Sequence, residues 1–303
     1  MVPDRWYIIL ETRELPKGKP LGVTRLGHRM ALWRDGEGVL RATGDDCPHR
    51  GAALSSGKLV NGCIACPFHG FQFDGRGACT HIPAHGPEGP IPPKMRVPSW
   101  PVAEAQGFVW LWFGQGQPGP LPWFDDIDDT FVFDTLTDDW DTHYTRAIEN
   151  QLDFTHLPFA HHNSIGRGVP GKLAVLTEVD GDRMVVRYDP ATYDAKGFFV
   201  ELWAPNLWRN RLANGVWVVA AFVPIDANRT RLYLRFYQRF VTIPGLGWLV
   251  CWVSNLFNRR VLNQDKRIVL TQEPRETALR MNEVLLPSDR PIIEFRKWRE
   301  KHL

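Results

Sequence analysis

The sequence has no long apolar run, no excess of charge of either sign and few cysteines. Lys and Arg number 36 against 34 Asp and Glu, so the composition gives no reason to expect a nucleic acid or an anionic membrane as partner. The most apolar run, residues 246–257, is too short to span a bilayer and contains Ser254 and Asn255. We therefore expect no transmembrane segment. We assign this run to a buried helix or a pocket wall, with a membrane or partner surface as the alternative.

Residues 1–20 lack the basic-then-apolar order of a secretory signal, because Asp4, Glu11 and Glu14 are spread through them. This predicts a cytoplasmic location. In a reducing compartment, 5 cysteines are better explained by metal ligation than by disulfides. A G-x-G-x-x-G spacing follows the strand-like segment 108–112, at residues 114–119, but proline-rich residues and not a helical pattern come after it, so it does not fit a dinucleotide-binding motif. The sequence also contains no second cysteine-rich cluster, so we expect NAD(P)H to act only through a separate reductase.

The chain of 303 residues is long enough for two domains. Short β-branched and aromatic runs at 7–10, 29–33, 39–42 and 108–112, punctuated by Gly and Pro, predict a small all-β domain. The following GQGQPGPLP stretch fits neither strand nor helix. We therefore expect an N-terminal domain of residues 1–118 and a second domain of residues 119–303.

The second domain shows helical patterns near both ends and strand-like segments between them. Residues 142–156 and 258–272 are compatible with helix, each ending near a proline. The strand-like segments, separated by turn residues, are 172–179, 183–188, 198–203, 215–223 and 229–239. This order predicts one antiparallel sheet accompanied by helices, and hence an α+β chain.

Two Cys–His pairs form the first candidate site. Cys47 and His49 form a C-x-H pair, and Cys66 and His69 form a C-x-x-H pair after sixteen intervening residues. Two thiolates on one iron and two imidazoles on the other are the ligands of a Rieske [2Fe-2S] cluster. A structural zinc site is the alternative, because Cys63 and Cys66 have a zinc-like spacing, although C-x-H is unusual for zinc.

Here the sequence resembles a known family. The segments CPHRG and CPFHGFQFDGRGAC, followed by IPAH, resemble the Rieske domain of the Rieske non-haem iron oxygenases over nearly the whole N-terminal domain. Phe71 departs from the pattern, since many members carry Trp there, and either ring could cover the cluster. The resemblance implies a catalytic domain similar to the helix-grip (START-like) fold.

A second candidate site lies in residues 150–161. Asn150, Asp153, His156 and His161 give the pattern N-x-x-D-x-x-H-x-x-x-x-H. Two His and one carboxylate form the facial triad of non-haem iron(II) oxygenases, so His156 and His161 are the expected ligands of a mononuclear iron. These residues could instead be capping and surface residues at a helix end. His162 competes with His161, but the spacing in the resembled family favours His161.

The third ligand is expected to be Asp265. Its neighbours on the expected helix face are mostly apolar, namely Val261, Leu262, Ile268 and Val269. A lone carboxylate facing a core is costly unless it is paired or bound to a metal. The segment QDKRIVLTQEP also resembles the family segment that supplies the carboxylate. Glu273 is the rival ligand, and a surface ion pair of Asp265 with Arg259 or Arg267 is the alternative.

The resemblance implies further roles. The family's Asp at the position of Asp153 links a cluster ligand of a neighbouring subunit to an iron ligand, which here would connect His69 to His156. This implies a ring-shaped oligomer, expected to be a homotrimer, with Asn150 close to the iron. It also implies O₂ as co-substrate and a reductase or ferredoxin as electron donor, for which Arg50, Lys58, Lys94 and Arg96 could form a docking patch.

The substrate is expected to be an apolar or aromatic small molecule. The candidate pocket residues are Trp203, Leu207, Trp208, Leu212, Trp217, Phe222 and Trp252. The single compact chain looks more like the monooxygenase and demethylase members than the ring-dihydroxylating ones. Three alternatives stay open: a dioxygenase, an electron carrier or redox sensor without a working second site, and a ligand-binding protein with a zinc module.

Overall fold

The computed structural model describes residues 1–195 and 197–303. The chain divides into two compact units. One, the N-terminal unit, is Pro3–Gly119; the other, the C-terminal unit, is Met1–Val2 together with Pro120–Leu303. The boundary expected from the sequence, between residues 118 and 119, lies beside this division.

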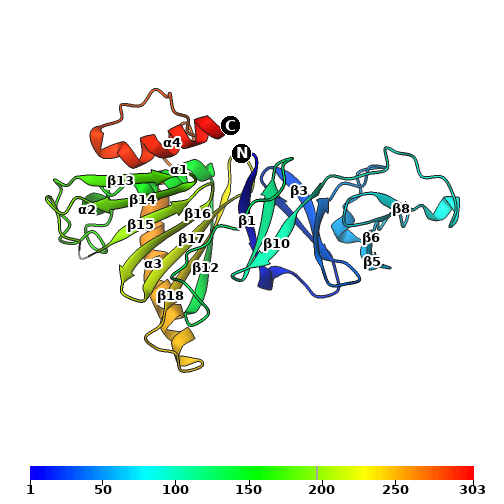
Figure 1. Ribbon diagram of the computed structural model, residues 1–303, viewed down its shortest axis with the longest axis horizontal. Helices are drawn as coiled ribbons and strands as arrows, with labels where there is room; N and C mark the ends of the chain where they lie inside the picture. The colour runs from blue at the N-terminus through cyan, green and yellow to red at the C-terminus, as the bar shows by residue number, and fades with distance from the viewer. Residues whose placement is uncertain (196) are drawn as a thin grey trace. The chain divides into compact units, whose positions relative to one another are not determined.

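The N-terminal unit is all β, as the sequence predicts, with three antiparallel sheets in its described residues (Figure 1). The first has the order β1-β11-β10, with β1 Arg5–Glu11, β10 Val102–Ala105 and β11 Phe108–Phe113. The second is β2-β3-β4-β9, with β2 Leu21–Arg25, β3 His28–Arg34, β4 Leu40–Gly44 and β9 Ser99–Trp100. The third is β5-β6-β7-β8, with β5 Lys58–Val60, β6 Cys63–Ala65, β7 Gln72–Phe73 and β8 Cys79–His81. Single 3-10 turns lie at Thr12–Glu14, Leu54–Ser56 and Pro83–His85.

The C-terminal unit contains a seven-stranded antiparallel sheet in the order β12-β18-β17-β16-β15-β14-β13. Its strands are β12 Val132–Trp140, β13 Val175–Asp180, β14 Arg183–Tyr188, β15 Phe199–Trp203, β16 Leu207–Ala213, β17 Val216–Pro224 and β18 Thr230–Gln238. Its helices are α1 Tyr144–Leu152, α2 Leu157–Ala160, α3 Leu246–Val269 and α4 Arg290–His302, with a 3-10 turn at Pro287–Asp289. The predicted sheet with helices, and the α+β class, are confirmed.

Two strands of the C-terminal sheet, β12 and β16, were missed because their side chains are unusually polar. β12 contains three Asp, and β16, LWRNRLA, contains two Arg and an Asn. On β16 the charged and the less polar residues alternate, so each set faces one side of the sheet. Arg209 on one side is paired with the carboxylates of Glu201 and Asp126, which explains how a strand so rich in charge lies in the middle of the sheet.

The most apolar run is not a buried helix, and that part of the expectation was wrong; its end does form part of a cavity wall, through Ser254 and Phe257. Residues 246–257 form the first half of α3, which begins twelve residues before the predicted start at 258. α3 packs on β12 and β18, while much of the outer side of its first half is exposed. Within the described residues, no helix is both long and apolar enough to cross a membrane.

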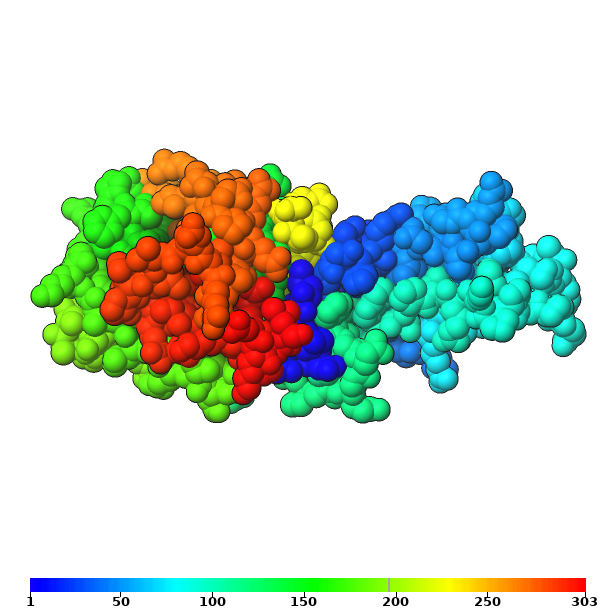
Figure 2. All heavy atoms as spheres, turned by 90° about the horizontal axis from the view of Figure 1, so that it is seen from above, coloured from blue at the N-terminus to red at the C-terminus, as the bar shows by residue number. Residues whose placement is uncertain are grey.

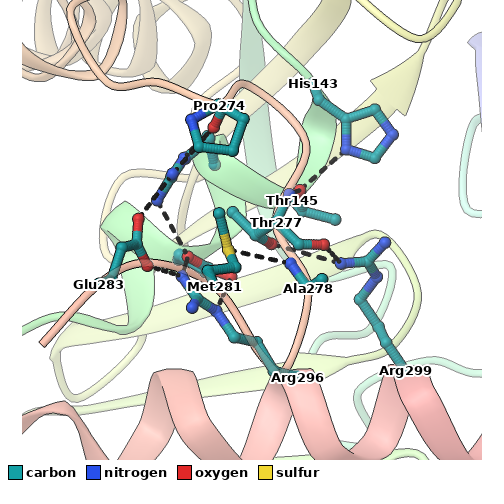
Figure 3. Close-up of polar contacts among 11 residues, drawn as sticks. His143, Thr145, Pro274, Thr277, Ala278, Met281, Glu283, Arg296 and Arg299 are labelled. Carbon is teal, nitrogen blue, oxygen red and sulfur yellow. Dashed lines mark hydrogen bonds and ion pairs between the residues drawn. The ribbon is translucent and has the colours of Figure 1, made fainter. Parts of the chain in front are cut away.

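A buried group of ion pairs attaches α1 to α4. The Arg296 guanidinium donates to both carboxylate oxygens of Glu149 at 2.8 and 2.7 Å and also contacts Glu283 at 2.8 Å. Figure 3 labels Glu283 and Arg296 of this group. Arg146 of α1 also donates to Glu283 at 2.7 Å, so one carboxylate bridges two cations. Figure 2 shows α4, in red, beside the orange-red segment before it on one face of this unit. α1 is therefore fixed by charges that neutralise one another.

We predict that Arg296→Met lowers the free energy of unfolding of the C-terminal unit by about 3–5 kcal/mol, because it leaves the carboxylates of Glu149 and Glu283 with Arg146 as their one remaining buried cation among the described contacts. Urea denaturation measures this change. The matched control is Arg290→Met, whose exposed pair with Glu294 spans 2.7 Å and should contribute less than about 1 kcal/mol. Equal losses in the two variants would contradict the prediction.

Candidate metal centres

Two turns of the N-terminal unit have the same backbone hydrogen-bond pattern. In the turn after β4, the Cys47 amide donates to a carbonyl beyond the turn at 2.9 Å, and the Gly51 amide donates to the Cys47 carbonyl at 2.8 Å. In the turn after β6, Cys66 and Gly70 repeat the pattern with 2.8 and 3.0 Å. Both glycines have positive φ, 72° and 71°, where other residues are strained. Each turn therefore presents one Cys and one His in the same way.

The thiols of these turns point inward and the imidazoles outward. Cys47 and Cys66 are buried, whereas His49 and His69 are exposed, with their Nδ1 atoms 3.2 Å apart. Burial raises the pKa of the Cys47 thiol to about 11, while the backbone N–H groups of the turn favour its thiolate. A metal is the partner that makes such a buried sulfur a thiolate. The arrangement fits a cluster with thiolates on its inner iron and imidazoles on its outer iron.

The remaining cysteines take no part in these turns. Cys63 is half-buried, with its sulfur 3.6 Å from the Thr80 hydroxyl. Cys79 and Cys251 are buried, and the latter lies on α3 in the other unit.

The second motif lies where α1 ends. The predicted helix reached about residue 156, but α1 stops at Leu152 because Asp153 takes an extended conformation. Its carboxylate accepts hydrogen bonds from the Thr155 backbone N–H and hydroxyl, both at 2.7 Å. His156 and His161 then flank the single turn of α2. The break in the helix is what turns both imidazoles toward α3.

The structure brings His156, His161 and Asp265 together. The Asp265 Oδ1 atom lies 2.8 Å from the His161 Nε2 and 3.4 Å from the His156 Nε2. One ligand atom from each residue lies within 4.8 Å of the others, a spacing that one metal ion can bridge with small side-chain movements. Asp265 comes from α3 and is 3% exposed. Two imidazoles and one carboxylate, with space beside them, are the donor set of a non-haem iron(II) site.

Two glutamines that the sequence did not reveal orient these ligands. Gln264 accepts a hydrogen bond from the His161 Nδ1–H at 2.8 Å, which leaves Nε2 with a lone pair for a metal. Gln151 donates to the second oxygen of Asp265 at 3.3 Å. Gln264 directly precedes Asp265, and nothing in its spacing alone distinguishes it from a surface residue.

The charges of this site balance one another. Burial lowers the pKa of His156, but the carboxylates of Asp153 and Asp265 outweigh this and raise it to about 9. Burial alone would raise the pKa of Asp265, yet His156 and His161 hold it well below its usual range. Without a metal, protons supply the positive charge that the buried carboxylate requires. A divalent metal would replace those protons.

The other candidate residues lie at different distances from this group. Asp153 Oδ2 lies 3.7 Å from the His156 Nδ1, an atom that is buried without a hydrogen bond in the described part of the chain. The Asn150 amide also has a buried nitrogen without a partner there, and it lines the adjacent cavity. Glu273 lies outside the group, exposed and 3.5 Å from Arg275. His162 is exposed and contacts the Phe159 carbonyl.

A cavity of about 340 Å³ adjoins the three residues. Apolar side chains from the sheet, α2 and α3 line it, with polar groups at the end where the His and Asp side chains meet. Of the expected lining residues, Trp208 and Leu212 take part. Five do not, and that expectation was wrong for them: Trp203, Leu207, Trp217, Phe222 and Trp252. On β16, Leu207 has the opposite parity to Trp208 and therefore faces the other side of the sheet.

Comparisons with family models match both units. Residues 5–101 match the model described as Rieske [2Fe-2S] domain. Residues 140–211 and 198–303 match the model described as vanillate O-demethylase oxygenase C-terminal domain, which accounts for more than half of the chain.

Known proteins give a consistent result. The oxygenase component of dicamba O-demethylase from Stenotrophomonas maltophilia is 39% identical over 53% of this chain and 48% of its own length. Pheophorbide a oxygenase from Oryza sativa subsp. japonica is 27% identical over 98% of this chain and 64% of its own length. The chain thus spans about half to under two thirds of these curated relatives.

Solved structures share the fold. The structure of dicamba monooxygenase bound to dicamba has a TM-score of 0.81 at 25% identity, covering 99% of this chain and 97% of that chain. Pseudomonas putida CBB5 NdmA also has a TM-score of 0.81, at 24% identity, covering 98% and 89%. Together with the paired Cys–His turns and the family models, these findings identify the chain as a member of the Rieske non-haem iron oxygenase family.

Proposed function

We propose that this protein is the oxygenase component of a Rieske monooxygenase system that hydroxylates or oxidatively demethylates a neutral, mainly apolar small molecule. The observation that carries the proposal is the group of His156, His161 and Asp265 at one end of an apolar cavity. A site for electron transfer alone has no need of such a cavity. The similarity to dicamba O-demethylase supports demethylation over ring dihydroxylation.

In this proposal each group of residues has one task. Cys47, Cys66, His49 and His69 hold the cluster, and His156, His161 and Asp265 hold a mononuclear iron(II). When bound, these groups supply electrons and dioxygen chemistry that places one oxygen atom in a C–H bond and the other in water. The two glutamines keep the ligand atoms aimed at the metal position. The apolar walls exclude water and hold the substrate beside it.

Asp153 is proposed to join the two centres across a subunit boundary. Its carboxylate is partly exposed and lies 3.7 Å from the His156 Nδ1. His69 is exposed at the surface of the N-terminal unit. In the proposed assembly, the His69 of a neighbouring copy donates the ring N–H that does not face the cluster to this carboxylate. A homotrimer, in which each copy serves its neighbour, is the assembly proposed on this basis.

An external electron donor is also part of the proposal. Arg50, Lys58, Lys94 and Arg96 are all exposed, and the Arg50 guanidinium lies over the Phe68 ring, next to His69. A basic surface beside exposed cluster ligands suits an acidic ferredoxin or reductase, through which NAD(P)H would act. The cytoplasmic location stays a prediction.

The cavity favours a neutral substrate with one polar edge. Within the described residues its lining includes no Lys or Arg, so a ligand carboxylate lying away from the metal position would have no counter-ion. On β16, Trp208 and Asn210 face the cavity, and the Trp208 Nε1 and Asn210 Oδ1 atoms are buried without hydrogen bonds there. With a small side-chain rotation that turns these atoms into the cavity, a ligand that accepts from the indole N–H and donates to the amide oxygen would satisfy both.

We predict that Asp265→Asn lowers the iron content by about one iron per chain and leaves the cluster spectrum unchanged, because only the mononuclear site loses its carboxylate. Metal and sulfide analysis with electron paramagnetic resonance measures both. The control is Glu273→Gln, which should retain all the iron. If Glu273→Gln loses the iron and Asp265→Asn does not, the ligand assignment is wrong.

We predict that naphthamide binds the resting holoprotein at least about tenfold more tightly than naphthoate, because the described lining offers no Lys or Arg to a carboxylate and the charge of the iron is already met by Asp265. Replacing Trp208 by Phe and Asn210 by Leu should weaken naphthamide roughly threefold to tenfold per lost hydrogen bond, as measured by calorimetry. Leu212→Met, a neighbouring change on the same strand face, is the control and should leave the preference intact. Equal binding of both probes would exclude this substrate class.

The proposed reaction is tested with oxygen-18. The holoprotein, reduced chemically, is exposed to labelled dioxygen with neutral methylarenes, whose alcohol product would retain the label, and with methyl aryl ethers, whose demethylation is followed by formaldehyde release. Labelled alcohol or released formaldehyde with the wild type and neither with His156→Ala, at unchanged cluster content, supports an oxygenase. A fully reducible cluster with no mononuclear iron and no product in the wild type would leave an electron carrier.

A further inference from the structure

In the first half of α3 the large apolar side chains lie on the outer side of the helix, away from the sheet. The side that faces β12 and β18 carries Gly247, Cys251 and Asn255, all buried. The outer side carries six large apolar residues that are 43–52% exposed: Trp248, Leu249, Trp252, Val253, Leu256 and Phe257. A helix packed on a protein and facing water shows the reverse arrangement. We call these six residues the α3 patch.

The α3 patch continues into the segment before the helix. Phe240 and Ile243 are 64% and 63% exposed, more than most of the patch itself. Figure 1 shows the first turns of α3 and this segment extending past the end of the sheet. The rings of Trp248 and Trp252 lie stacked, with centroids 6.5 Å apart, so the apolar surface is continuous along the helix. Contiguous exposed apolar surface of this kind marks an interaction site.

The charge around the α3 patch is positive. The chain as a whole is nearly balanced, but residues 227–264 contain no Asp or Glu. Arg259 and Arg260 follow the patch directly on α3 and are exposed. The carboxylate of Asp134, on β12, accepts hydrogen bonds from the Asn255 side-chain amide and from the Trp248 indole N–H. The partner of this surface should therefore be apolar where it meets the patch and negative where it meets the two arginines.

We propose that the α3 patch docks on the surface of a lipid bilayer containing anionic lipid. The helix would lie in the plane of the interface, with its Trp, Leu and Phe side chains among the acyl chains and Arg259 and Arg260 at the phosphate headgroups. Interfacial helices combine large apolar side chains with Arg in this way, and each basic residue near an anionic surface adds to the binding.

A second copy of this chain fits the α3 patch less well. If two copies met with parallel helices, Arg259 and Arg260 of one would face the same residues of the other. If they met antiparallel, these arginines would lie against the partner's apolar first turn. In neither arrangement does an acidic residue of the patch pair with Arg259 and Arg260, which would be buried at the contact. Anionic headgroups can pair with these arginines in any orientation of the helix.

The test is co-sedimentation of the full-length holoprotein with vesicles. We expect binding to vesicles of phosphatidylcholine mixed with phosphatidylglycerol, and weaker binding to phosphatidylcholine alone or at high salt. The double variant Leu249→Glu with Leu256→Glu should reduce binding by about tenfold or more, because it places charges in the interface. Neither residue lines the cavity, so iron content and turnover should stay unchanged.

The matched control is Leu176→Glu with Val284→Glu, which makes the same charge change at exposed apolar positions elsewhere and should keep vesicle binding. Quenching of wild-type tryptophan fluorescence by brominated lipid provides a second readout that needs no variant. The proposal is overturned if the wild type does not bind vesicles, or if both double variants lose binding equally. If the wild type does not bind vesicles and light scattering shows that the Leu249→Glu, Leu256→Glu variant has a changed oligomeric state, the α3 patch is an interface between copies of the chain.

Discussion

A carboxylate buried beside two imidazoles sets the condition that the C-terminal unit has to meet. Asp265 lies on the inner side of α3 and is almost fully buried, so it requires positive charge at close range. His156 and His161 provide it only because α1 stops at Leu152 and the chain turns back through α2. The position of α1 in turn depends on Glu149 and its buried pair with Arg296. The geometry of the metal site thus depends on two buried charge pairings: Glu149 with Arg296, which positions α1, and Asp265 with the two imidazoles.

The same principle separates the two sides of β16. On the outer side, Arg209 is neutralised by Glu201 and Asp126 and lies over the rings of Phe124 and Trp217. On the inner side, the neutral side chains of Trp208 and Asn210 keep polar atoms that the protein does not satisfy. A strand that holds its charges on one side can thus leave the other side open to an uncharged ligand.

The sequence predicted the parts whose residues lie close together along the chain. The Cys–His pairs and the segment of residues 150–161 are short, so residue type and spacing were enough to bring them out. Asp265 was found because a carboxylate among apolar helical neighbours has to be paired. The all-β first unit and the antiparallel sheet followed from β-branched runs and turn residues.

What the sequence could not supply depends on contacts between distant segments. The sequence of β16 is too polar to be predicted as a strand, because the carboxylate of Glu201 that pairs with its Arg209 lies on another strand. Gln264 became recognisable only through its hydrogen bond to His161, more than a hundred positions away. Three expected lining residues, Trp203, Leu207 and Trp217, failed because the side of the sheet that each faces is set by strand register. The outward apolar side of α3 was only the alternative, because composition alone favours a buried position for such a run.

The pair of Glu149 and Arg296 joins positions 147 residues apart, and proteins are made from the N-terminus onward. The two Cys–His turns lie close together in the first half of the chain, with their imidazoles only 20 positions apart. The N-terminal unit therefore has all its ligands while much of the polypeptide is still unmade. α1 gains its counter-ion only after Arg296 has left the ribosome. The structural conditions for the two metal centres are met at different times during synthesis, the cluster turns first.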